Sequence, residues 1–79
     1  MRLDKYLKVS RLIKRRTVAN EACDAGRVMV NDRPAKASAD IKAGDKITIS
    51  FGNKDVSVEV LSVQETVRKE EVRELFRYL

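Results

Sequence analysis

The chain has 79 residues, a formal net charge of +5 and a sequence pI near 9.7. This length suits one small domain, which buries only about 60% of the surface that its unfolded chain exposes. Hydrophobic residues make up 43% of the sequence, enough for a folded core and too many for a disordered tail. No apolar run approaches the roughly 18 residues of a membrane span, and no signal peptide is evident, so we expect a cytoplasmic protein.

The composition also argues against several kinds of chemistry. The chain has no histidine and one cysteine, Cys23, so we expect neither an internal disulfide nor a metal cage of nitrogen and sulfur ligands. No nucleophile–base pair and no glycine-rich phosphate loop stands out. We therefore expect a protein that is not an enzyme, with no catalytic residues, no cofactor and no bound metal.

The first predicted element is a helix over residues 3–9. Leu3, Tyr6 and Leu7 fall at i, i+3 and i+4, so they share one face and are expected to enter the core. Asp4 lies in the first turn, where a carboxylate suits the positive end of the helix dipole. The lysines of this helix point elsewhere, toward solvent or a ligand.

A second helix is predicted over residues 16–25. Gly26 is placed to end it, because glycine adopts the left-handed conformation without strain. Arg15 and Arg16 stand at its first turn, where the helix dipole disfavours cations, and a local cost without structural gain points to function. Its narrow apolar stripe consists of residues at helical spacing: Val18, Ala19, Ala22 and Cys23.

A small sheet is predicted next. Residues 27–30 form a short strand that ends in a turn at Asn31. Residues 35–43 are polar and irregular, with Ile41 as the single expected anchor. Residues 46–51 and 56–63 alternate between apolar and polar side chains, which predicts two strands joined as a hairpin by a turn that begins at Gly52.

The last predicted element is a helix over residues 67–79, whose apolar stripe is Val72, Leu75, Phe76 and Leu79. The stripe is either part of the core or a docking surface for another protein. The expected fold class is α+β, with two short N-terminal helices packed on a small, mostly antiparallel sheet, plus a short C-terminal helix. We expect residues 1–79 to form one domain, with a core over about 1–63 and a helical tail over about 67–79.

Positive charge is concentrated at the amino-terminal end. Of the 17 cations and 12 carboxylates, seven cations and one carboxylate lie within residues 1–16, which gives that block a net charge of +6. Clustered Lys and Arg hold phosphates through charge and through the forked donors of arginine. A merely solvated surface is the plain alternative, but the block has almost no acidic residues among its cations. The pattern predicts a polyanion-binding face made of Arg2, Lys5, Lys8, Arg11, Lys14, Arg15 and Arg16.

Four segments together resemble the S-four RNA-binding domain family, also called the alpha-L RNA-binding motif. They follow the order and approximate spacing of that family and read RLDKYL (2–7), KRRTVA (14–19), AGRVMVN (25–31) and AGDKI (43–47). The chain departs from the family pattern at Arg15, where the family often has serine, and at residues 36–38. The resemblance implies an RNA face built from the first helix, the loop and the second helix, with Arg27 and Asn31 near its rim.

The chain resembles most the free-standing bacterial members of this family, which act in ribosome-associated quality control. The resemblance implies binding to stalled large ribosomal subunits through large-subunit ribosomal RNA and peptidyl-tRNA. It also implies a role beside RqcH, which extends the stalled peptide with alanine without an mRNA. We further expect a monomer. We expect no membrane partner, because the basic helices lack a wide apolar face. The alternatives are a general structured-RNA-binding module and a protein-interaction adaptor that uses the C-terminal stripe.

Overall fold

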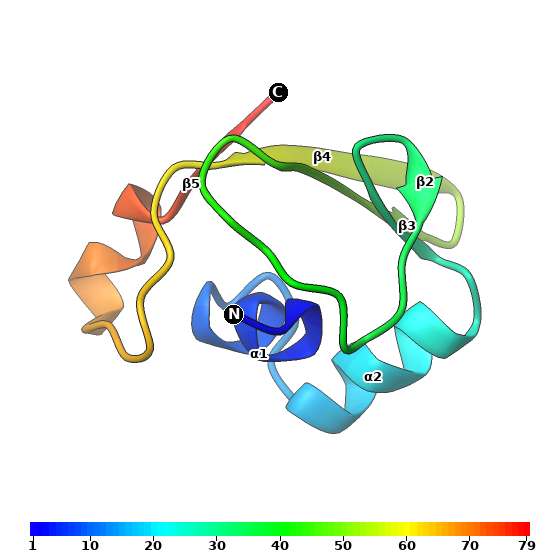
Figure 1. Cartoon of the computed structure of the whole chain (residues 1–79), viewed down its shortest axis with the longest axis horizontal. Helices are drawn as coiled ribbons and strands as arrows, with labels where there is room; N and C mark the ends of the chain where they lie inside the picture. The colour runs from blue at the N-terminus through cyan, green and yellow to red at the C-terminus, as the bar shows by residue number, and fades with distance from the viewer.

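The computed structural model describes residues 1–79 and places two helices against one face of a five-stranded sheet (Figure 1). The helices are α1 (Leu3–Val9) and α2 (Arg16–Asp24). A 3-10 helix, η1 (Lys69–Glu74), precedes the last strand. The strands are β1 (Val28–Val30), β2 (Arg33–Pro34), β3 (Lys46–Phe51), β4 (Lys54–Val60) and β5 (Phe76–Tyr78). The predicted α+β class, with two N-terminal helices on a small sheet, is confirmed.

The sheet has the strand order β2-β1-β3-β4-β5, and every neighbouring pair is antiparallel. The predicted hairpin is its centre, with Ile47 opposite Val58 and a turn in which Gly52 has a φ of 65°. Its second strand ends at Val60 and does not reach residue 63. The predicted turn after β1 is also present, because Asn31 takes a positive φ of 53° there.

The hydrophobic core lies between the two helices and the sheet. Leu3, Tyr6 and Leu7 are fully buried, so the predicted core face of α1 is confirmed. The sheet contributes its inward-facing aliphatic side chains, which are Val28, Ile47, Ile49, Val58 and Val60. The prediction of one anchor in residues 35–43 is wrong, because Ala37 is buried there together with Ile41.

The apolar stripe of α2 is narrower than predicted. Ala19 and Cys23 are buried, whereas Val18 is 48% exposed. Burial, with the negative charges of Asp4 and Asp24 nearby, raises the pKa of the Cys23 thiol to about 11. Such a thiol is protonated at neutral pH, so Cys23 acts as a small core residue.

Neither α-helix combines the length and the apolar character needed to cross a bilayer.

The predicted helix over residues 67–79 is wrong in its second half. The 3-10 helix ends at Glu74, and residues 76–78 pair with β4 as the fifth strand. The cause is tertiary: an open edge of β4 would leave backbone groups unpaired, and β5 pairs with them. Leu75 and Phe76 are buried in the core, while Leu79 is exposed, so the predicted stripe is divided between core and surface.

Candidate nucleic-acid interface

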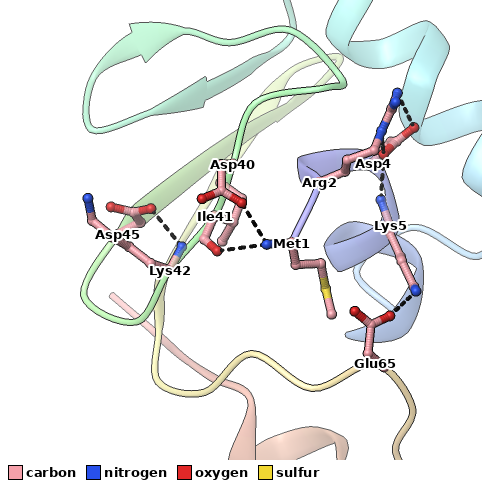
Figure 2. Close-up of polar contacts among 9 residues, drawn as sticks. All are labelled: Met1, Arg2, Asp4, Lys5, Asp40, Ile41, Lys42, Asp45 and Glu65. Carbon is pink, nitrogen blue, oxygen red and sulfur yellow. Dashed lines mark hydrogen bonds and ion pairs between the residues drawn. The ribbon is translucent and has the colours of Figure 1, made fainter.

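A buried carboxylate joins α1 to α2 beneath part of the basic block. Asp4 is only 2% exposed and accepts hydrogen bonds from the side chains of Arg2, Arg16 and Asn20. Its Oδ1 lies 3.2 Å from Nε of Arg2, and its Oδ2 lies 3.3 Å from Nε of Arg16. The backbone N–H of Lys5 donates to the same carboxylate at 2.8 Å. We call Arg2, Asp4, Arg16 and Asn20 the Asp4 cluster; Figure 2 shows its Arg2–Asp4 side.

The Asp4 cluster fixes the position of two predicted RNA-binding arginines. Burial alone would raise the pKa of Asp4, but the hydrogen bonds to its charged form outweigh burial and the pKa is lowered. Asp4 therefore stays ionised, and one carboxylate orients two guanidinium groups whose side chains remain about half exposed. The interpretation that the position of Arg16 brings no structural gain is wrong, because Arg16 pairs with Asp4 at the start of α2.

A second group of cations lines an open groove of about 390 Å³ between the end of α1 and residues 65–67. We call it the cation groove; its lining residues are Lys8, Val9, Arg11, Lys14, Glu65, Thr66 and Val67. Glu65 is its one carboxylate and is paired with Lys5 (Figure 2). The hydrogen bond and charge of Lys5 lower the pKa of Glu65.

Four of the predicted cations have no carboxylate partner. None of these four takes part in an ion pair of the structure. The other three cationic side chains of the basic block do: Arg2 and Arg16 pair with Asp4, and Lys5 pairs with Glu65. The free cations are all exposed: Lys8, Arg11, Lys14 and Arg15. Their charge is therefore available to an anionic ligand, which is the property that a phosphate-binding surface requires.

The two rim residues differ in their relation to this group. Arg27 lies on a different groove, between α2 and the β3–β4 hairpin, which Lys14 also lines. The Asn31 side chain is hydrogen-bonded within the fold: it donates to Asp45 at 3.1 Å and accepts from the backbone N–H of Lys46 at 3.0 Å.

The sequence assigned no role to Asn20, because nothing in it shows that Asn20 contacts Asp4 between α1 and α2.

Arg11 adopts a backbone conformation that favours glycine. Its φ is 63°, in the left-handed region, which costs a non-glycine residue about 1 kcal/mol. We predict that Arg11→Gly raises the free energy of unfolding by about 0.5–1 kcal/mol, because the strain is removed. Urea denaturation measures this change, with Lys8→Gly as the control, since Lys8 has an ordinary helical backbone within α1 and glycine there should lower stability. A loss of stability in Arg11→Gly would contradict the assignment of strain.

The chain matches the S4 domain family model over residues 1–47. It is 59% identical over 76 residues to a Halalkalibacterium halodurans protein named RQC P-site tRNA stabilizing factor, covering 96% of this chain and 86% of that protein. It is 53% identical over 79 residues to the Bacillus subtilis protein of the same name, covering 100% and 92%. The structure superposes on the trimeric structure of Vibrio cholerae heat shock protein 15 with a TM-score of 0.92 at 29% identity, over 100% of this chain and 81% of that one.

These matches extend through both helices, the hairpin and the C-terminal strand, and the S4 match takes in the Asp4 cluster and the four free cations. This class of domain is the S-four RNA-binding domain that the sequence resembles. The chain belongs to the S4-domain family, within the group of its members named RQC P-site tRNA stabilizing factor (RqcP).

Proposed function

We propose that this protein is a non-enzymatic RNA-binding factor of ribosome-associated quality control that acts in the cytoplasm. The observation that carries the proposal is the group of four exposed, unpaired cations, together with two arginines that Asp4 holds in place. Structured RNA is recognised mainly through its shape and its backbone, for which such a surface is suited. The names of the relatives from H. halodurans and B. subtilis support the pathway.

The two cation groups suggest how one small domain can contact two RNA segments. In the proposal, the Asp4 cluster binds phosphates of one segment and the cation groove binds phosphates of the other. We infer that these segments are large-subunit ribosomal RNA and peptidyl-tRNA on a stalled large subunit. Joining them raises the effective concentration of each for the other, so the tRNA stays in place while RqcH adds alanine.

Arg2, Lys5, Lys8, Arg11, Lys14, Arg15 and Arg16 are the proposed RNA-binding residues, with Arg27 and Asn31 at the rim. The alternative is an adaptor that docks through the apolar stripe of a C-terminal helix. Two residues of that stripe, Leu75 and Phe76, are buried in the core and cannot form a docking surface. A general structured-RNA-binding role would use the same surface. Only its RNA partner would differ.

The arginines of the Asp4 cluster provide the test of this proposal. We expect Arg2→Ala and Arg16→Ala each to reduce co-sedimentation with large ribosomal subunits about 10-fold, because each removes a charged, forked phosphate donor. Arg33→Ala is the matched control, since Arg33 is exposed on β2 and forms no ion pair. Crosslinking from position 16 in cells would identify the RNA.

Unchanged co-sedimentation of folded Arg2→Ala and Arg16→Ala variants would refute the proposed interface. Crosslinks to ribosomal RNA and tRNA together would support the bridging role. Crosslinks to other RNA alone would leave only the general RNA-binding role.

A further inference from the structure

A second groove lies between α2 and the β3–β4 hairpin and has a volume of about 530 Å³. This volume falls within the roughly 300–1,000 Å³ that is usual for small-ligand sites. Its apolar lining comes from the α1–α2 connection, α2 and the hairpin: Leu12, Ile13, Val18, Ala22, Ile49 and Phe51. Val18 is 48% exposed and Phe51 is 41% exposed, so the fold leaves this hollow open to solvent. We call it the apolar groove.

The remaining lining of the apolar groove is polar and positively charged. Lys14 and Arg27 line it and no carboxylate does, so its charge favours an anionic occupant over a cationic one. Ser50 adds a hydroxyl group that can exchange hydrogen bonds with a polar edge.

This combination matches the chemistry of a nucleotide. A base stacks on an aromatic side chain and packs against aliphatic groups, and the phosphates beside it bind Lys or Arg. An apolar peptide with acidic residues would share the charge, but the position of the groove favours RNA. Lys14 lines both the cation groove and the apolar groove, so an RNA backbone in the first reaches the second without leaving the surface.

We propose that the apolar groove receives one unstacked nucleobase of the bound RNA, an inference that rests on the proposed function. The base lies against the Phe51 ring and the Val18 side chain, and Lys14 and Arg27 contact the phosphates on either side of it. The groove thereby gives the protein a preference for RNA with an unpaired nucleotide, which phosphate contacts alone do not provide.

Two RNA hairpins test the inference, one with a single bulged uridine and one identical but fully paired. We expect the wild-type protein to bind the bulged hairpin about 10-fold more tightly, since stacking one base on an aromatic side chain has an effect of this order. Phe51→Ala should lose that preference and keep its affinity for the paired hairpin. Leu61→Ala is the matched control, because Leu61 is 43% exposed and lies outside the groove, and it should keep the preference.

The outcomes separate this inference from the proposed function. If wild type shows no preference, or if Phe51→Ala retains it, the inference is wrong while binding of the paired hairpin leaves the proposed function intact. If wild type binds neither hairpin, both are wrong. If binding of a Glu- and Leu-rich peptide requires Phe51 and binding of neither hairpin does, the groove is a peptide site and the inference is wrong. Phe51→Leu, which keeps an apolar side chain without the ring, replaces Phe51→Ala if the latter does not fold.

Discussion

Replacing Leu75 with alanine is expected to lower the free energy of unfolding by about 3 kcal/mol, because truncating a buried leucine removes packing and leaves a cavity. Leu75 is fully buried, and its carbonyl oxygen accepts a hydrogen bond from the Tyr6 hydroxyl at 2.7 Å. The backbone N–H groups of Leu61 and Ser62 donate to the same oxygen. These contacts join the C-terminal segment to α1 and to the end of β4. The total free energy of unfolding of a domain of this size is roughly 5–10 kcal/mol, so the loss is large.

Leu79→Ala is the matched control for Leu75→Ala. Leu79 belongs to the same predicted apolar stripe but is 61% exposed, so its truncation should change the free energy of unfolding by less than about 0.5 kcal/mol. Urea denaturation followed by circular dichroism measures both. Equal small effects at the two positions would show that the C-terminal segment lies outside the core, and would restore the adaptor hypothesis.

The second large effect is expected when the four unpaired cations are removed together. We predict that replacing Lys8, Arg11, Lys14 and Arg15 with alanine lowers affinity for a structured RNA hairpin on the order of 100-fold, because several phosphate contacts are lost. None of the four pairs with a carboxylate in the structure, so the fold should tolerate the change. Fluorescence anisotropy at fixed salt gives the affinity.

A charge-matched variant controls for the loss of net charge. It carries alanine at four other exposed cations: Arg33, Lys36, Lys54 and Lys69. Both variants remove four positive charges and lower the formal net charge from +5 to +1. The control should lose only a small part of the affinity, since none of its four residues lines the cation groove or belongs to the Asp4 cluster. Equal losses in the two variants would mean that net charge, and not the proposed surface, attracts the RNA.

The sequence predicted the elements whose patterns are local. The i, i+3, i+4 spacing of Leu3, Tyr6 and Leu7 identified both α1 and its core face, and strict alternation identified the β3–β4 hairpin. The C-terminal strand could not be predicted in this way. Residues 72–79 carry a helical pattern, and only the free edge of β4, which the sequence does not reveal, favours a strand at Phe76.

The sequence indicated which residues form the candidate site, but not how they are arranged in space. The excess of Lys and Arg near the amino terminus was visible by counting, and the four free cations belong to it. The grouping of Arg2 with Arg16 depends on a contact between α1 and α2 through Asp4, which was assigned only to the helix dipole. Phe51 continues the alternation of Ile47 and Ile49 and lines the apolar groove together with Ile49, but β3 ends at Phe51 and leaves 41% of this residue exposed.

The salt dependence of RNA binding tests the central claim most directly. If the cation groove and the Asp4 cluster neutralise about five phosphates, the logarithm of the association constant should fall against the logarithm of salt concentration with a slope of roughly −3.5 to −4.5. The variant that lacks Lys8, Arg11, Lys14 and Arg15 should have a slope shallower by roughly 2 to 3, because it removes the three cations of the cation groove. A wild-type slope near zero, or the same slope in that variant, would contradict the claim that these side chains hold the RNA backbone.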